Sequence, residues 1–213
     1  MRRAFVIVFF ATIIWWLWPD RGLRHPPGIT APTTPAQQSI SPKALGEING
    51  YQIQALATYA IHARVLHTKR YWSQGNDLVP YDVALGWGAM SDQSVLDRLD
   101  ISQANRFFFY QWSDEPPVAA GEIVRSAANV HVISANRTVA RAVRRLRVGE
   151  LVAMRGYLVN ISGPNGFSWN TSLMRDDTGN GACELFYVEE VLVSDQPLPA
   201  NYAAMVAIPR KGR

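Results

Sequence analysis

The sequence predicts an α+β protein, in which a single N-terminal transmembrane helix precedes a compact, β-rich domain with one or two short helices. Three observations predict this class. Residues 4–18 form an unbroken apolar run at the start of the chain. Several later segments alternate apolar and polar residues with the period of two that is typical of strands. Residues 137–146 carry valine and leucine at the spacing of an amphipathic helix.

The apolar run contains no charged residue and ends in a tryptophan-rich stretch before Pro19 and Asp20. As a helix it would rise about 22 Å, against a hydrocarbon core of about 30 Å. A cleaved signal peptide is therefore the alternative, but small residues suited to cleavage do not follow the run. Its tryptophans suit a membrane interface. The run predicts an uncleaved signal-anchor, with the lipid bilayer as partner through residues 4–18.

The predicted orientation places the rest of the chain on the outer face of a bacterial inner membrane. Four segments are predicted. They are an anchor at 1–20, a linker rich in Pro, Thr and Ser at 21–45, a β-rich extracytoplasmic domain at 46–195 and a basic tail at 196–213.

The formal net charge of +4 is unevenly distributed along the chain. Each end, up to Arg24 and from Arg210 onward, carries +3, so −2 remains for the residues between them. A domain with this balance disfavours nucleic acid as a partner, because phosphate backbones are bound by clustered Lys and Arg. The single cysteine, Cys183, excludes an internal disulfide.

The domain is predicted to contain strands and two short helices. The strands are expected at 50–72, 101–112, 128–134, 151–161, 167–173 and 183–193. The helices are expected at 93–99 with Ser91 as cap, and at 137–146 with Asn136 as cap. Gly163 to Gly166 predict a hairpin turn. The string VGELVAMRGYLV resembles a strand of an OB-type barrel, so the domain is predicted to be barrel-like, with an OB-like barrel as one form.

Residues 78–92 contain a proline and two glycines, too many helix breakers for one long helix. This stretch therefore predicts an exposed loop that forms a recognition surface. Its candidate binding residues are Trp87, Asp82 and Met90.

Catalytic candidates are few. His131 is a candidate base, and Asp82, Asp177 and Glu184 are candidate carboxylates for hydrolysis of a polymer. Cys183 falls on the apolar face of its predicted strand and is predicted to be an inert buried thiol. The histidines and the cysteine form no tight ligand motif, so neither a metal nor a cofactor is predicted.

Two longer strings, LVPYDVALGWGAMSD and TSLMRDDTGNGACELFYVEE, carry a resemblance. With the short string RYW they resemble an uncharacterised family of small bacterial exported or single-pass membrane proteins. The resemblance implies a bacterial origin and a general architecture, and it implies no activity or catalytic residue.

These observations together predict a non-catalytic, membrane-tethered module of the bacterial envelope that binds proteins or another ligand. Other envelope proteins are the predicted partners, because a tether concentrates the domain near them. The alternative function is an envelope hydrolase that uses carboxylates together with His131.

Overall fold

The computed structural model describes residues 22–72, 77–174 and 183–198. Strands make up 50% and helices 15% of the described residues, so the α+β class is wrong and the protein is mostly β. Within these ranges no helix is both long and apolar enough to cross a membrane. The predicted transmembrane helix at residues 4–18 lies outside the described residues.

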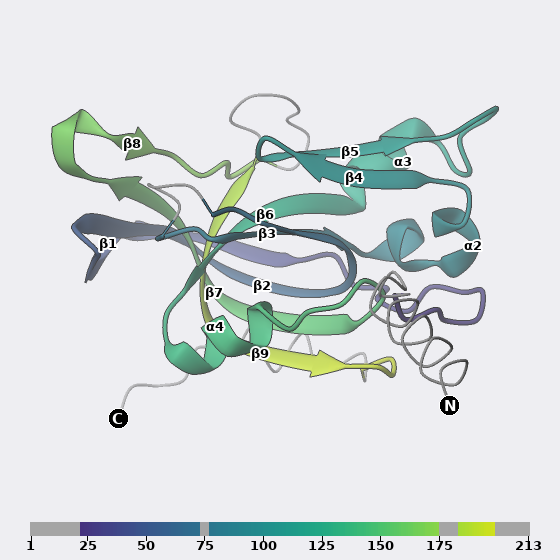
Figure 1. Ribbon diagram of the computed structural model, residues 1–213, viewed down its shortest axis with the longest axis horizontal. Coiled ribbons are helices and arrows are strands. Elements are labelled where there is room, and N and C mark those ends of the chain that lie inside the picture. Colours follow the sequence, from purple (N-terminus) through teal and green to yellow (C-terminus); the bar gives the residue numbers. More distant parts are fainter. Residues whose placement is uncertain (1–21, 73–76, 175–182, 199–213) are drawn as a thin grey trace, which may run out of the picture.

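One sheet of seven strands dominates the structure (Figure 1). Its strand order is β1-β2-β3-β6-β9-β7-β8, and a further pairing of β2 with β7 closes five of the strands into a barrel. The strands are β1 (Ala36–Ile48), β2 (Tyr51–Arg70), β3 (Tyr81–Gly86), β6 (Ala127–Ser134), β7 (Leu151–Ser162), β8 (Ser168–Trp169) and β9 (Glu184–Ser194). Only β6 and β9 among these pairs run parallel. A five-stranded barrel with this strand order and one parallel pair has the arrangement of an OB-type barrel.

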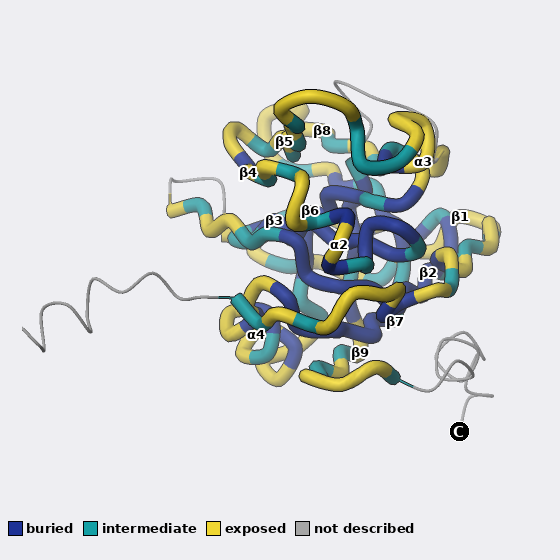
Figure 2. Tube along the Cα trace, turned by 90° about the vertical axis from the view of Figure 1, so that its right-hand side faces the viewer, coloured by how far each residue is buried: buried dark blue, intermediate teal, exposed yellow. Residues whose placement is uncertain are grey.

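The barrel interior is built from alternate residues of its strands. These residues are among the buried ones that Figure 2 draws in dark blue. Alternation places every second side chain on one face of a strand, so Ala57 to Val65 of β2 supply the inner face at odd positions. Across the interior, the rings of Tyr59 and Phe186 meet edge to face with centroids 4.9 Å apart. Helix α4 (Arg137–Val143) packs Val139 and Val143 against this core.

Helix α4 confirms the predicted amphipathic helix, because Asn136 accepts hydrogen bonds from the amides of Thr138 and Val139 at its start. The strands predicted at 128–134, 151–161 and 183–193 are also present as β6, β7 and β9. The predicted strand at 167–173 is reduced to the two residues of β8.

An insertion between β3 and β6 lies against the outside of the barrel (Figure 1). It consists of η1 (Gly88–Ser91), α2 (Gln93–Leu96), β4 (Asp100–Ala104), β5 (Phe107–Gln111) and α3 (Ala120–Arg125). The single buried strand predicted at 101–112 is therefore wrong, since it is a hairpin of β4 and β5 whose aromatic run is partly exposed. The N-cap of α2 is Asp92, which accepts from the Ser94 amide, rather than the predicted Ser91.

The predicted linker is also wrong where the structure describes it. Residues 36–45 belong to β1, which pairs with the first half of β2. The sequence misleads because β1 is an edge strand, and the polar residues that suggest a linker are mostly exposed on it. Residues 22–31 also contact the domain, beginning with a hydrogen bond of 2.7 Å from the Leu23 amide to the Val148 carbonyl.

The predicted recognition loop at 78–92 is wrong as well. Trp87 is 2% exposed, and Asp82 and Met90 are fully buried. The reason is that β3 occupies the barrel between β2 and β6, while η1 folds back onto the barrel. The glycines that suggest an exposed loop instead permit close packing, since a Cβ on Gly86 would lie 2.3 Å from the Met90 carbonyl oxygen.

His62 on β2 is a buried polar residue with a consequence for stability. It is 1% exposed, and its Nε2 atom has no hydrogen-bond partner among the described residues. Burial lowers the pKa of His62 below its ordinary value, because an imidazolium is poorly solvated there. The pKa of His62 is therefore higher in the unfolded chain than in the folded protein. As the pH falls through about 6.5, the imidazole is protonated in the unfolded chain first.

We expect the free energy of unfolding to fall as the pH drops from 7 to 5, since proton binding then favours the unfolded chain. In His62→Gln this fall should be smaller, because the titrating group is gone. Urea unfolding at several pH values measures both slopes. Equal slopes in the two proteins would show that His62 does not contribute.

Candidate functional site

Two of the catalytic candidates meet on the outer face of the barrel. Asp82 of β3 is paired with His131 of β6 in the sheet register, and paired residues share a face. The Nδ1 atom of His131 lies 2.8 Å from Oδ1 of Asp82. Their neighbours along the strands, Val83 and Val130, point into the barrel interior.

A third residue, Arg106, joins this pair from the turn of the β4–β5 hairpin. Its Nη1 donates to Oδ1 of Asp82 at 2.5 Å, and its Nη2 donates to the Val79 carbonyl at 2.9 Å. The backbone amide of Arg106 donates to the Tyr71 hydroxyl at 2.8 Å. The buried Asp82 carboxylate thus pairs with the guanidinium and holds it in one orientation.

Arg106 adopts an uncommon backbone conformation. The two-residue turn between β4 and β5 has φ of 51° at Asn105 and 71° at Arg106. Positive φ at both central residues is a feature of type I′ turns, where Asn and Gly are the usual residues. An arginine there costs conformational energy, and such costs are concentrated at functional sites.

Aromatic rings enclose the arginine and the histidine. The guanidinium carbon of Arg106 lies 3.9 Å from the ring centroid of Tyr71 and 5.6 Å from that of Trp169. The rings of His131 and Trp169 have centroids 4.8 Å apart. Burial raises the pKa of the Tyr71 phenol, the hydrogen bond from the Arg106 amide lowers it, and the nearby Asp82 carboxylate raises it.

A chain of amides supports the hairpin turn from the sheet. The Asn129 side chain donates to the Arg106 carbonyl at 2.9 Å and accepts from Gln103 at 2.5 Å. Gln103 in turn lies 2.9 Å from Nδ1 of His67 on β2. These contacts connect β2, β4 and β6 beneath the turn, so Arg106 rests on a rigid base.

Exposure increases from this base toward solvent. Asp82 and His131 are 0% and 2% exposed, while the Arg106 side chain is 19% exposed. Three exposed aromatic residues lie close to Arg106 or Tyr71 in the sequence, namely Trp72, Phe107 and Phe109. Trp72 is 77% exposed, and the guanidinium carbon of Arg70 lies 3.3 Å from its ring centroid. We call Trp72, Arg106, Phe107 and Phe109 the aromatic rim.

The remaining candidates do not join Asp82 and His131 within the described residues. Glu184 pairs with Val130, so its side chain lies on the inner side of the barrel wall, away from His131. Asp177 lies outside the described residues. Cys183 is half-buried, with its sulfur 3.9 Å from the Arg106 carbonyl oxygen. Across the described ranges, the His, Cys, Asp and Glu residues form no group of three or more that could hold a metal ion.

No family model, curated protein or solved structure matches this chain. The suggested family resemblance therefore stays a prediction. The function must be inferred from the geometry and chemistry of the site itself.

Proposed function

We propose that this protein is a non-catalytic ligand-binding module, and that the aromatic rim binds an uncharged, ring-bearing oligomer such as an oligosaccharide. The observation that carries the proposal is the fixed placement of the partly exposed Arg106 side chain. It is clamped by a buried carboxylate and stacked on Tyr71, and exposed aromatic residues follow Arg106 and Tyr71 in the chain.

The aromatic rim suits a ligand made of rings. Phe107 and Phe109 lie two residues apart on β5 with ring centroids 6.3 Å apart, so both can contact successive units of an oligomer. Aromatic faces offer apolar contact area at a low cost in side-chain entropy. Asp82 and Val79 hold the guanidinium of Arg106 in place, and 19% of its side chain is exposed on the side where a ligand would approach.

The position of Trp72 and of the two rings that contact Arg106 also supports binding. Tyr71 and Trp72 belong to the loop between β2 and β3, and Trp169 lies between β7 and β9. In OB-type barrels the corresponding two loops and the adjoining sheet face bind oligonucleotides or oligosaccharides. This support is an analogy between folds, so the site chemistry has to select the ligand.

Charge favours a sugar over a nucleic acid. The residues between the two basic ends carry a formal charge of −2, and the Arg106 guanidinium is already paired with Asp82. Binding of a phosphate backbone requires several unpaired cations, because counterion release supplies most of the affinity. An uncharged oligosaccharide avoids that requirement.

Burial favours binding over catalysis. A general base must come within hydrogen-bond distance of the proton that it removes. His131 is 2% exposed and lies under the rings and Arg106. In this arrangement Asp82 and His131 act as the support that orients Arg106, and they do not contact the ligand.

Isothermal titration with chitotetraose, a neutral oligosaccharide, tests the proposal. We expect saturable binding to the wild type and a loss of about fivefold in affinity in Phe107→Ala, in line with one aromatic contact of about 1 kcal/mol. Trp72→Ala should lose a similar amount. Leu192→Ala is the control, because Leu192 is 40% exposed on β9 outside the rim.

Two outcomes would contradict the proposal. If all three variants bound chitotetraose with the affinity of the wild type, the binding site would lie outside the aromatic rim. Tighter binding of single-stranded DNA, weakening steeply with salt, would favour a nucleic acid ligand instead. The expected envelope location and envelope partners stay predictions.

A second function, hydrolysis of a polymer, is favoured by one observation. The distance of 2.8 Å between Asp82 and His131 is that of a carboxylate orienting an imidazole. If this function holds, the bound oligosaccharide should be shortened over hours, as measured by mass spectrometry. His131→Gln should then abolish cleavage. An unchanged oligosaccharide in the wild type would leave only the binding function.

A further inference from the structure

A separate pocket lies at the end of the domain where residues 22–25 meet α2. Its volume is about 570 Å³, within the usual range for small-molecule sites. Most of its wall is apolar and comes from Leu23, Val65, Leu66, Leu96, Leu99, Ile101 and Val148. The few polar groups are Arg24, Arg64, His67, Gln93 and Asp97. An apolar wall with a small number of convergent polar groups is typical of a ligand-binding pocket.

Arg64 is the unusual group of this pocket. It is 3% exposed, and its guanidinium donates to the carbonyls of Ser91 and Leu23 at 3.2 and 3.3 Å and to the Gln93 side chain. All three acceptors are neutral. Its Nε atom has no hydrogen-bond partner among the described residues. A buried cation without a hydrogen-bonded carboxylate is costly, because its loss of hydration is poorly compensated.

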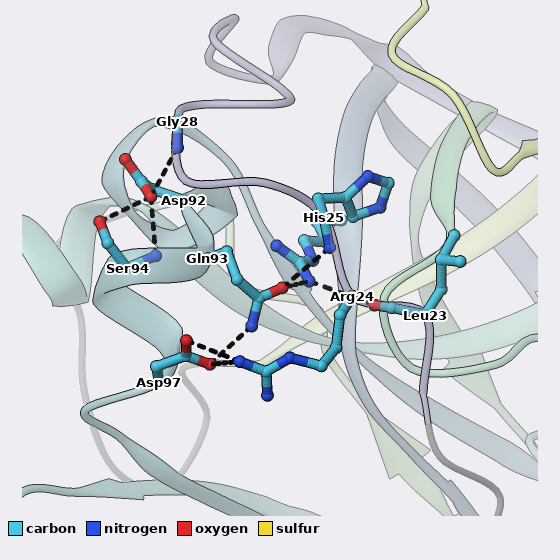
Figure 3. A network of polar contacts seen from close by, with 9 residues as sticks. Leu23, Arg24, His25, Gly28, Asp92, Gln93, Ser94 and Asp97 are labelled. Atoms are coloured by element: carbon cyan, nitrogen blue, oxygen red, sulfur yellow. Dashed lines mark hydrogen bonds and ion pairs between the residues drawn. The ribbon is translucent and has the colours of Figure 1, made fainter.

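The nearest carboxylate of the pocket is already occupied. Asp97 accepts two contacts of 2.7 Å from Arg24 and one of 2.7 Å from Gln93 (Figure 3). Figure 3 also shows the Gln93 side chain between Asp97 and the backbone of His25, which donates to Gln93 at 3.1 Å. The lining thus holds two arginines and one aspartate, and that aspartate is hydrogen-bonded to Arg24 and Gln93 and not to Arg64.

The N-terminal stretch is held firmly over this site. His25 lies 2.7 Å from the Gly149 carbonyl through Nε2, and the Gly28 amide donates to Asp92 at 2.9 Å. A Cβ on Gly149 would lie 1.8 Å from the Leu23 carbonyl oxygen, so the two backbones are in close contact. The wall that includes Leu23 is therefore preformed, and binding need not order it.

From these observations we infer that the pocket binds a small amphipathic monoanion, a carboxylic acid with an apolar body, whose carboxylate pairs with Arg64. The Nε–H group of Arg64 can donate to a carboxylate oxygen, and such charged hydrogen bonds are about twice as strong as neutral ones. The apolar body would contact the leucines and isoleucine of the wall. The site is distinct from the aromatic rim and does not depend on the function proposed there.

Calorimetric titration of the full chain with decanoate and with its neutral analogue decanamide tests the inference. We expect decanoate to bind at least about tenfold more tightly than decanamide, because only decanoate offers a negative charge to pair with the Arg64 guanidinium. This comparison uses the wild type alone, so it does not depend on the folding of a variant.

Three variants locate the effect. In Arg64→Gln the preference for decanoate over decanamide should disappear. Arg137 is exposed on α4, so Arg137→Gln should keep the preference. Val148→Trp should lower the affinity for both ligands, because Val148 lines the pocket and a larger side chain there would fill part of it. The fold should tolerate this change, because Val148 is 40% exposed. Equal binding of the two ligands, or no binding of either, would overturn the inference. Decanoate binding that survives both Arg64→Gln and Val148→Trp would also overturn it.

Discussion

Replacing Asp82 by alanine is expected to lower the free energy of unfolding by about 3–5 kcal/mol. Asp82 is fully buried, and its Oδ1 atom contacts both Arg106 and His131. Its removal deletes the buried carboxylate that is paired with Arg106 and leaves His131 without the carboxylate that orients it. Loss of one member of a buried ion pair is costly for this reason.

Urea unfolding followed by circular dichroism measures the change. Asp100→Ala is a suitable control, because Asp100 is exposed on β4, and its substitution should change stability by less than about 0.5 kcal/mol. A loss below about 1 kcal/mol in Asp82→Ala would mean that the hairpin turn does not depend on this carboxylate. It would also weaken the role of Asp82 as the support of Arg106.

A second large effect, about 3–5 kcal/mol, is expected for Phe186→Ala. Phe186 on β9 is fully buried and packs edge to face on Tyr59 of β2, from the opposite wall of the barrel. Truncation to alanine removes this contact and leaves a cavity in a closed interior that can relax only in part. The urea concentration at the midpoint of unfolding should therefore fall, while the slope of the free energy of unfolding against urea concentration stays the same.

The matched control is Phe109→Ala on the hairpin. Phe109 is 44% exposed, so the same chemical change should cost far less stability than in the barrel. It should, however, weaken ligand binding at the aromatic rim. Comparable stability losses in the two variants would contradict the assignment of Phe186 to the closed core.

Local patterns predicted much of the barrel. The strand at 50–72 follows from strict alternation, and α4 follows from its apolar spacing together with Asn136. These signals are local, because each depends on residues a few positions apart. The fold class was nevertheless wrong, since helices form only short elements in the described residues. Residues 36–45 were assigned to a linker because an exposed edge strand and a linker share the same polar composition.

The candidate site was only partly predictable. Asp82 and His131 were selected for their chemistry, and the register between β3 and β6 pairs them although 49 residues separate them. Arg106 was missed, because its role depends on a turn that brings it to Asp82, 24 residues away. The apolar run around Arg106 suggested a single strand, and only the unusual sequence Asn105-Arg106 marks the turn. Trp87 was selected wrongly, because flanking glycines suit a buried ring as well as an exposed one.

The most direct test of the proposed function is an NMR titration of the isotope-labelled protein with chitotetraose. The proposal predicts saturable shifts at the Trp72 indole and at the backbone amides of Arg106 and Phe107, and none at Leu192 on β9. The absence of shifts at Trp72, Arg106 and Phe107, or shifts centred on another surface such as α4, would contradict it.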